Sequence, residues 1–301
     1  MNIQYPLLLD GGLSNELERQ GCVLNQKLWS AKLLEANPEA IVLAHLVYLK
    51  SGAQCITTSS YQATLPGFMA IGYDEGAASA LILKSVMLAE QARSRFVLSH
   101  PHSFKPLIAA SVGPYGAYLA NGSEYRGDYD ISDQELIDFH LPRIQLLENS
   151  TADVLACETI PSFQEALVLS EILRHCKKSA WISFSCKDGK HISDGTPIEK
   201  CAAFLAHHPT LFAVGVNCTS PKYISELIQS IKKKSGDKKI IVYPNSGAVY
   251  HAGSKTWSGL SDLSSCELMM KEWLDLGADM IGGCCGIGPE QINAMSKIIY
   301  Q

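Results

Sequence analysis

Short apolar runs alternate with longer segments of helical periodicity along the whole chain. The runs are almost continuously hydrophobic and rich in β-branched residues, as expected for parallel strands that are buried on both faces. We therefore predict eight strands, at residues 7–10, 54–59, 107–112, 153–158, 180–185, 211–218, 239–244 and 278–284.

A segment of helical periodicity follows each of these strands. The helix signals are clearest at Asn37-Pro38, where an N-cap residue precedes a proline at the first helical position, and at the N-cap residue Ser132. The predicted helices cover residues 38–50, 74–96, 133–149, 162–176, 197–206, 221–234, 264–276 and 289–299.

Eight strand–helix units in 301 residues predict a (β/α)8 TIM barrel, formed as a single α/β domain over residues 1–301. Neither a linker nor a shift in composition divides the chain, and the extra length falls in the loops after the first, third and seventh strands. A doubly wound open sheet is the competing fold, but its GxGxxG fingerprint does not follow the first strand.

In a barrel the active site lies at the C-terminal ends of the strands, so reactive residues there are informative as a set. Cys218 ends the sixth strand, and the Cys284-Cys285 pair ends the eighth. Barrel closure would place both strand ends on one rim, with glycines leaving space around the pair. Three thiols in that arrangement predict a metal site, and zinc is the metal that three thiolates favour.

Three thiolates make an electron-rich zinc site, which suits the activation of a substrate thiol better than the splitting of water. Such a site leaves a fourth position open, and we expect the amide oxygen of Asn217 to fill it at rest. A thiol redox pair, a zinc-buffering site and an inert core are alternative interpretations of Cys284-Cys285. The other seven cysteines lie in apolar or helical segments and are expected to be core residues.

Carboxylates end two further strands. Asp10 ends the first strand and precedes Gly11-Gly12, and Glu158 ends the fourth strand. Together they suggest a substrate that carries a positive amine, while a turn cap at Asp10 and a structural ion pair at Glu158 are the alternatives. The predicted rim also includes polar residues at other strand ends, namely Ser59, Tyr61 and Asn245.

Charge and composition narrow the range of partners. A net charge of −5 and a pI of about 6.0 give no electrostatic case for binding nucleic acid or an anionic membrane. No apolar run reaches the ~18–20 residues of a membrane helix, and the N-terminus lacks a secretory signal. Ten cysteines without a disulfide framework fit a cytoplasmic protein with reduced thiols.

Ordered motifs stand at the strand ends over nearly the whole chain. They are Leu8-Leu9-Asp10-Gly11-Gly12, Thr57-Thr58-Ser59-Ser60-Tyr61, Ser111-Val112-Gly113-Pro114, Glu158-Thr159, Val216-Asn217-Cys218, Pro244-Asn245-Ser246-Gly247 and Gly282-Gly283-Cys284-Cys285-Gly286. These motifs resemble those of the homocysteine S-methyltransferase family. The resemblance implies a zinc-dependent, homocysteine-binding barrel domain that methylates L-homocysteine to methionine. It also implies that Cys218, Cys284 and Cys285 are the zinc ligands, and that Asp10, Gly11 and Glu158 contact the amino acid.

The methyl donor is also implied by the resemblance. Residues 60–64 and 122–129 are similar to the branch of the family that uses S-methylmethionine, for which S-adenosylmethionine often serves as a second donor. Betaine and folate- or cobalamin-linked donors are the alternatives. Aromatic residues expected to face a cationic sulfonium donor are Tyr61, Tyr115, Tyr125 and Trp257. We expect a monomer whose partners are small-molecule substrates.

Overall fold

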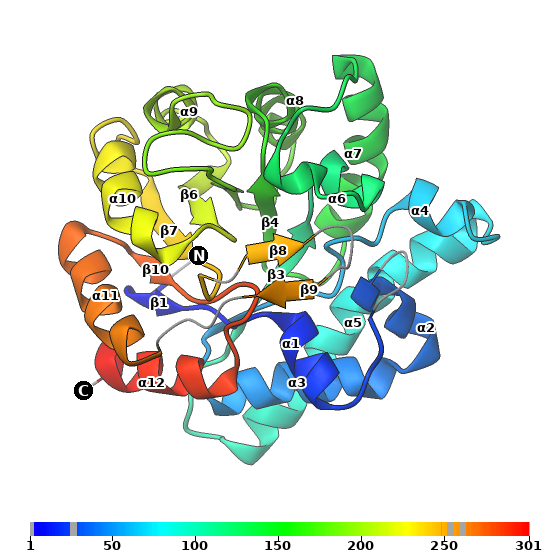
Figure 1. The fold of residues 1–301 in the computed structure, drawn as a ribbon. Coiled ribbons are helices and arrows are strands. Elements are labelled where there is room, and N and C mark those ends of the chain that lie inside the picture. Colours follow the sequence, from blue (N-terminus) through cyan, green and yellow to red (C-terminus); the bar gives the residue numbers. More distant parts are fainter. Residues whose placement is uncertain (1–2, 25–28, 248, 252–255, 259–262, 301) are drawn as a thin grey trace.

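Eight parallel strands form a barrel at the centre of the molecule, and helices surround it (Figure 1). The computed structural model describes residues 3–24, 29–247, 249–251, 256–258 and 263–300. The barrel strands are β1 (Leu7–Leu8), β2 (Cys55–Thr57), β3 (Leu107–Val112), β4 (Val154–Ile160), β5 (Ala180–Phe184), β6 (Leu211–Asn217), β7 (Lys239–Tyr243) and β10 (Met280–Ile281).

The two edges of the sheet meet, and this contact closes the barrel. The strands follow the order β1-β10-β7-β6-β5-β4-β3-β2, and each neighbouring pair is parallel. A parallel bridge between Leu9 and Cys55 joins β1 to β2, and the amide of Asp10 donates to the Cys55 carbonyl at 3.0 Å. The predicted (β/α)8 barrel is therefore confirmed, and an open doubly wound sheet is excluded.

An outer helix follows each barrel strand, as the alternating pattern predicted. These helices are α3 (Pro38–Lys50), α5 (Glu75–Ser99), α7 (Asp133–Glu148), α8 (Phe163–Arg174), α9 (Ile198–Leu205), α10 (Ile224–Lys232), α11 (Leu263–Leu276) and α12 (Pro289–Tyr300). The predicted caps form, because Asn37 accepts a hydrogen bond from the amide of Ala40 and Ser132 makes a capping box with Glu135. Among the described helices, none has the length and apolar character needed to span a membrane.

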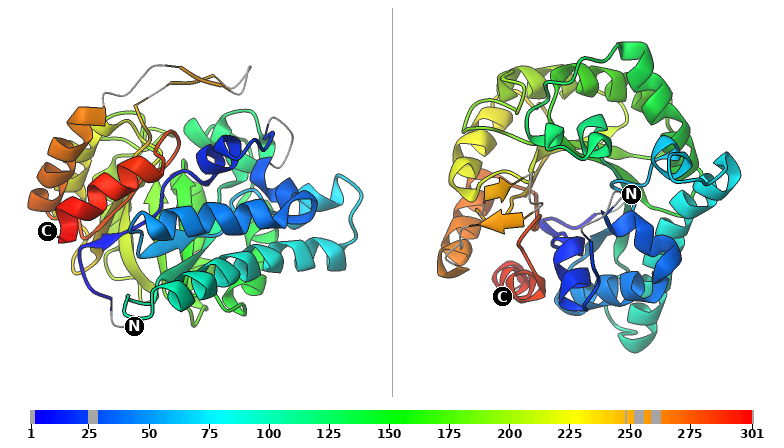
Figure 2. Two further views of the ribbon diagram at one scale, coloured as in Figure 1. Left: turned by 90° about the horizontal axis from the view of Figure 1, so that it is seen from below. Right: turned by 45° about the vertical axis from the view of Figure 1, so that its right-hand side comes forward.

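Short elements lie between the main strands and helices, and the hydrophobic pattern predicted none of them except Pro221–Tyr223, which lies within the predicted 221–234 helix. They are α1 (Leu13–Arg19), η1 (Trp29–Lys32), α2 (Leu33–Ala36), α4 (Leu65–Met69), α6 (Tyr115–Leu119), η2 (Ser123–Tyr125), η3 (Pro221–Tyr223), β8 (Val249–His251) and β9 (Thr256–Ser258). Each has three to seven residues, which is too short for hydrophobic periodicity to identify. The β8–β9 hairpin projects from one end of the barrel (Figure 2).

Side chains that alternate along the strands divide the core into two layers. Ala109 on β3 belongs to a small cluster with Trp181 and Met280, whereas its neighbours Ile108 and Ala110 belong to the larger cluster that includes the helices. This period of two, on strands buried on both faces, explains why the strands appear in the sequence as continuous apolar runs.

Most of the remaining cysteines fill core positions, as predicted. Cys55, Cys157 and Cys201 are fully buried. Cys22, Cys176 and Cys186 are partly buried and pack against the larger cluster. The side chain of Cys266 lies outside the described residues.

Paired charges join the strands at the N-terminal end of the barrel. Asp153, just before β4, accepts hydrogen bonds from Nη1 of Arg93 at 2.6 Å and from the amide of Ile108 on β3 at 2.7 Å. Asp279, just before β10, accepts hydrogen bonds from Nζ of Lys239 at 2.8 Å and from the amide of Ile240 on β7 at 2.9 Å. Each carboxylate therefore ties neighbouring strands together while a cation balances its charge.

Candidate active site and metal centre

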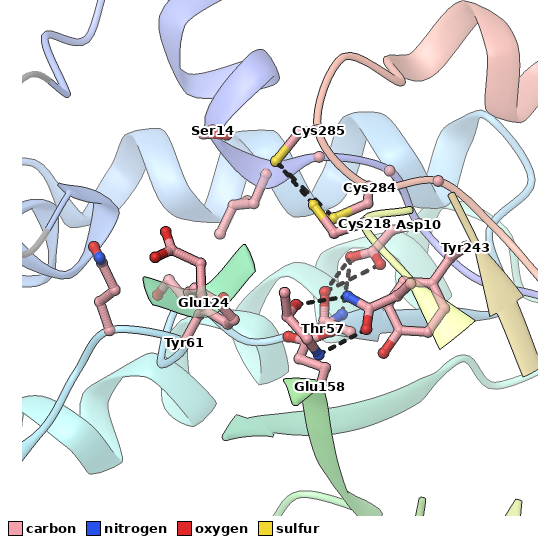
Figure 3. A pocket seen from close by; sticks show the side chains of 18 of the residues that line it. Asp10, Ser14, Thr57, Tyr61, Glu124, Glu158, Cys218, Tyr243, Cys284 and Cys285 are labelled. Carbon is pink, nitrogen blue, oxygen red and sulfur yellow. Dashed lines mark hydrogen bonds between the residues drawn. The ribbon is translucent and has the colours of Figure 1, made fainter. Parts of the chain in front are cut away.

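A cavity lies at the C-terminal ends of the barrel strands, where the predicted rim residues meet (Figure 3). Its wall comes from the segments that follow β1, β2, β3 and β10 and from the C-terminal ends of β4, β6 and β7. The predicted residues that line it are Asp10, Gly11, Ser59, Tyr61, Tyr125, Glu158, Asn217, Cys218, Cys284 and Cys285. Barrel closure thus brings together segments that are far apart in the sequence.

The three cysteines predicted as metal ligands bring their sulfur atoms together. The Sγ atom of Cys285 lies 3.5 Å from that of Cys218 and 4.0 Å from that of Cys284. All three atoms lie within 4.8 Å of one another. Sulfurs placed ~2.3 Å from a tetrahedral zinc ion are about 3.8 Å apart, so the observed spacing suits zinc. The thiols are free, because a disulfide bond needs a separation of about 2.0 Å.

Local backbone geometry fixes Cys218 at the end of β6. Its φ of 48° lies in the left-handed region, which residues other than glycine rarely adopt. The Cys218 amide donates to the Tyr243 carbonyl at 3.1 Å, and the Cys218 carbonyl accepts from Nδ2 of Asn245 at 3.2 Å. Strain of this kind costs about 1–3 kcal/mol and is found mainly at functional sites, where surrounding contacts hold it.

The three thiols ionise unequally when no cation is present. Hydrogen bonds from Cys284 and Cys285 hold the pKa of the Cys218 thiol well below its usual range. Donation to Cys218 in turn raises the pKa values of Cys284 and Cys285 well above the usual range, and burial adds to both shifts. Three thiolates can therefore coexist here only with a cation beside them, and a divalent metal ion would supply that charge.

Asn217 does not have the role that the sequence suggested. Its Oδ1 atom accepts hydrogen bonds from the amide of Thr159 at 2.6 Å and from Oγ of Ser183 at 2.8 Å. A carbonyl oxygen has two lone pairs, so none is left for a metal ion. Its Nδ2 atom donates to Oγ1 of Thr159 at 2.7 Å. Asn217 therefore ties β6 to β4 beside Cys218 and supports Thr159, whose φ is 61°.

Asp10 is a buried carboxyl group in the cavity wall. Its Oδ2 atom accepts from the Thr57 amide at 2.8 Å, and its Oδ1 atom accepts from Oγ1 of Thr57 at 3.1 Å. Burial raises the pKa of Asp10 to about 8 against the effect of these bonds, and the charge of Glu158 adds to the rise. At the next residue, a Cβ atom on Gly11 would lie 2.4 Å from the carbonyl oxygen of Ile287, so glycine is required there.

Glu158 forms the second buried carboxyl group of the wall. It accepts hydrogen bonds from Oγ of Ser111 and from the hydroxyl of Tyr243. Burial raises the pKa of Glu158 to about 7. Among the described residues, neither Asp10 nor Glu158 forms an ion pair. Two buried carboxyls without a cation favour a positively charged ligand.

The loop after β3 adds residues that the strand-end pattern missed. It returns over the cavity and carries Glu124 and Tyr125 into the wall. The hydroxyl of Tyr125 lies 3.3 Å from Sγ of Cys218. Burial raises the pKa of Glu124 to about 7, and its Oε2 atom has no hydrogen-bond partner among the described residues. This loop is not a strand end, so only the family resemblance of residues 122–129 and the choice of Tyr125 as an aromatic donor contact pointed to it.

The remaining predicted contacts divide between the cavity and its support. Of the four aromatic candidates, Tyr61 and Tyr125 line the cavity. Tyr115 instead lies in α6 and packs against other rings, with its centroid 5.1 Å from that of Phe139. Asn245 is not among the lining residues, and its side chain donates a hydrogen bond to the carbonyl of Cys218. Trp257 lies in β9, and its side chain is outside the described part of the structure.

Comparison with known proteins agrees with this geometry. A family model described as homocysteine S-methyltransferase matches residues 7–299. The chain belongs to the homocysteine S-methyltransferase family. Homocysteine S-methyltransferase YbgG of Bacillus subtilis is 50% identical over 300 residues, covering 97% of this chain and 94% of the relative. The homocysteine S-methyltransferase of Escherichia coli is 46% identical over 291 residues, covering 96% of this chain and 94% of the relative.

A solved structure gives the same result. The metallated form of the homocysteine methyltransferase MmuM from Escherichia coli superposes with a TM-score of 0.87 at 43% identity, over 97% of this chain and 95% of that chain. This homocysteine S-methyltransferase is therefore an enzyme that transfers a methyl group to homocysteine, as its sequence predicted. Its three-cysteine cluster is a group that could hold a metal ion.

Proposed function

We propose that this methyltransferase takes its methyl group from a sulfonium donor, S-methylmethionine, with S-adenosylmethionine as a second donor. We further propose that zinc, held by Cys218, Cys284 and Cys285, keeps the homocysteine sulfur nucleophilic. The observation that carries both proposals is the charge of the cavity wall.

The wall offers acidic groups and no basic side chain among the residues that the structure describes there. Three thiols stand beside the carboxyls of Asp10, Glu124 and Glu158. A concave site lined by one sign of charge concentrates ligands of the other sign. The metal ion, the ammonium group of homocysteine and a sulfonium donor are all cations, whereas a folate donor carries negative charge. The wall thus supports a sulfonium donor over a folate.

Unpartnered polar atoms support an amino-acid substrate. Asp10 and Glu158 would bind the ammonium group, which would favour their ionised forms. Oγ of Ser59 lines the cavity and has no hydrogen-bond partner among the described residues, so its hydroxyl is free to donate to the substrate carboxylate. The backbone at Gly11 lies beside these groups.

The chemistry needs a nucleophilic sulfur and a good leaving group. Zinc, when bound, would lower the pKa of the substrate thiol and hold the resulting thiolate. As the substrate thiol loses its proton to solvent, its sulfur attacks the methyl carbon and a new S–C bond forms. The sulfonium S–C bond breaks in the same step, and its electron pair returns to the donor sulfur. Homocysteine becomes methionine, and S-methylmethionine becomes a second methionine.

The chain's own residues would contribute mainly by placing the two substrates. The leaving group is a neutral thioether, so no general acid is required. The rings of Tyr61 and Tyr125 lie in the cavity wall, where aromatic faces would attract the sulfonium charge. Holding the sulfur in line with the methyl carbon makes a reaction between two molecules behave as a reaction within one complex. This positioning accelerates the reaction, because the entropy of bringing the reactants together is lost on binding.

An assay with separate donors tests the proposal. The purified, zinc-loaded enzyme would be given homocysteine with S-methylmethionine, S-adenosylmethionine, betaine or methyltetrahydrofolate. We expect the highest kcat/KM with S-methylmethionine. When both of its S-methyl groups carry ¹³C, each of the two product methionines should carry one label. Faster turnover with betaine or methyltetrahydrofolate would overturn the assignment of the donor.

A further inference from the structure

A buried polar network lies behind the active-site wall, and methyl transfer itself gives it no role. Its members are His140 and Arg143 on α7 and Glu165 near the start of α8, all of them buried. Oε1 of Glu165 lies 2.7 Å from Nε2 of His140, and Nδ1 of His140 lies 2.8 Å from Nη2 of Arg143. The network thus links a guanidinium group to a carboxylate through an imidazole.

The direction of these hydrogen bonds follows from the chemistry of arginine. A guanidinium group can only donate, so Nδ1 of His140 accepts and its proton must be on Nε2, which donates to Glu165. Burial lowers the pKa of His140 to about 4, so the imidazole is neutral under ordinary conditions. Arg143 and Glu165 therefore balance each other's charge across a neutral ring, which allows both to stay buried.

Glu165 also holds both ends of the loop that follows β3, residues 113–129. Its Oε1 atom accepts a hydrogen bond from the amide of Tyr115 at 2.6 Å, near the start of the loop. Its Oε2 atom accepts from the hydroxyl of Tyr129, at the end of the loop. Arg143 also holds the start of the loop, because its Nη2 atom donates a hydrogen bond to the carbonyl of Gly113. One carboxylate thus bridges two separate points of the loop.

The rest of this loop carries cavity-lining residues. Arg126 binds Asn121, Ser123 and Asp128 within the loop itself, whereas the bonds that join this part to neighbouring segments include two between neutral groups. Oγ of Ser185 donates to the carbonyl of Glu124 at 2.8 Å, and Nε2 of Gln62 donates to the carbonyl of Ala117 at 2.9 Å. Such bonds are weaker than those to a buried carboxylate. The position of Tyr125 beside Cys218 therefore depends on the two ends of the loop that Glu165 joins.

We infer that Glu165 is a positioning residue for methyl transfer: its carboxylate joins the two ends of the 113–129 loop and so places Glu124 and Tyr125 in the cavity wall. Glu165 is not among the residues that line the cavity, so it acts through the loop. The inference rests on methyl transfer to homocysteine and holds for any of the donors considered above.

The test compares two variants of helix α8. Glu165→Gln keeps the shape of the side chain but removes the charge that three donors share. Glu171→Gln is the matched control, because Glu171 is exposed on the same helix and pairs with Arg174 at the surface. We expect Glu165→Gln to lower kcat/KM by about 10²-fold, the effect of misplacing active-site groups by about 1 Å, with the metal content unchanged. The control should match the wild type.

Trypsin reports on the loop without using the reaction. Arg126 is the one lysine or arginine in residues 113–129, and its side chain is half-exposed. We expect cleavage after Arg126 to be faster in Glu165→Gln than in Glu171→Gln. This measurement does not depend on the donor, so an error in the proposed donor would leave it unchanged.

A double-mutant cycle separates positioning from general stability. If Glu165 acts by placing Tyr125, the variant with both Glu165→Gln and Tyr125→Phe should lose less activity than the product of the two single losses. Losses that multiply fully would overturn the inference, as would a Glu165→Gln enzyme whose cleavage and kcat/KM match those of the control. If Glu165→Gln does not fold, Tyr129→Phe removes the bond to Oε2 alone. That variant should show faster cleavage and a several-fold lower kcat/KM, and no change in either would contradict the inference.

Discussion

The two ends of the barrel treat carboxylates in opposite ways. At the N-terminal end, the partly buried Asp153 pairs with Arg93 at 2.6 Å, and the partly buried Asp279 pairs with Lys239 at 2.8 Å. At the C-terminal end, Asp10 and Glu158 are more deeply buried, and neither belongs to an ion pair within the described chain. Burial raises the pKa values of Asp10 and Glu158 to about 8 and about 7.

This difference shows where the fold gains stability and where it gives stability up. Carboxylates that a cation balances tie neighbouring strands together. Buried carboxyls without a cation favour the unfolded state once they ionise, because water solvates the charge better than the cavity wall does. Left-handed Cys218 and Thr159 add backbone strain at the same C-terminal end. Ligands that carry positive charge would restore the balance there.

The largest expected effect is the loss of a predicted metal ligand. Cys218→Ser should remove both bound metal and methyl transfer, because two thiolates and a hydroxyl bind zinc poorly. Cys176→Ser is the control, since Cys176 lies outside the cavity and packs at the edge of the core. Metal content by mass spectrometry and methionine formation are the measurements. Full turnover by a metal-free Cys218→Ser enzyme would remove the cysteine cluster from the chemistry.

Asp10→Asn should move activity and stability in opposite directions. It should lower kcat/KM for homocysteine by about 10²-fold, since a hydrogen bond to a charged group contributes about 1.5–3 kcal/mol. The free energy of unfolding of the ligand-free protein should instead rise at pH 8. The raised pKa means that the folded protein holds the Asp10 proton more tightly than the unfolded chain does. The wild type therefore loses stability as pH rises towards about 8, whereas asparagine has no proton to lose. Urea unfolding at pH 6 and pH 8 measures this slope, and a variant less stable than the wild type at pH 8 would contradict it.

At the other end of the barrel, Asp153→Asn should lower stability and leave activity unchanged. We expect a loss of about 1–3 kcal/mol in the free energy of unfolding, because buried Arg93 loses its carboxylate. The kcat/KM for homocysteine should stay at the wild-type value, since the substitution lies far from the cavity wall. Urea unfolding and steady-state kinetics are the two measurements. A fall in kcat/KM without a fall in stability would contradict the claim that the N-terminal end of the barrel stabilises the fold while the C-terminal end binds ligands.

The smallest expected effect is the dependence of amino-acid binding on pH. Ionisation of Glu158 and Asp10 should strengthen binding of an ammonium group as pH rises through about 7 and about 8. Methionine serves as the probe, because it carries the amino-acid group without an ionisable thiol. Its inhibition constant should fall several-fold over this range, and the fall should be smaller in Asp10→Asn. An inhibition constant that rises with pH would show that these carboxyls do not bind the ammonium group.

The parts predicted from sequence are those that depend on periodicity and on barrel closure. Eight apolar runs define the eight strands, and their C-terminal ends must share a rim, so Cys218 could be placed beside Cys284 and Cys285 from the sequence. The same argument put Asp10 and Glu158 in the cavity. Each of these residues lies within a few residues of the C-terminal end of a barrel strand.

The parts that were missed depend on contacts between distant segments. Asn217 carries an amide that suits a metal ion, and only the structure shows that Thr159 and Ser183 use both lone pairs of its oxygen. Glu124 enters the cavity because the 113–129 loop folds back, and that path depends on Glu165 in a helix beyond the next strand. Side-chain hydrogen bonds across such separations leave no periodic signal in the sequence.

X-ray absorption at the zinc edge tests the central claim most directly, namely that three cysteines hold a metal ion that accepts the homocysteine sulfur. The zinc-loaded enzyme would be measured alone and after addition of homocysteine, with methionine as a control that has no thiol. Three sulfur ligands alone, four with homocysteine and three with methionine are the predicted result, with zinc–sulfur distances of about 2.3 Å. An unchanged count of three sulfurs in the presence of homocysteine would contradict the account.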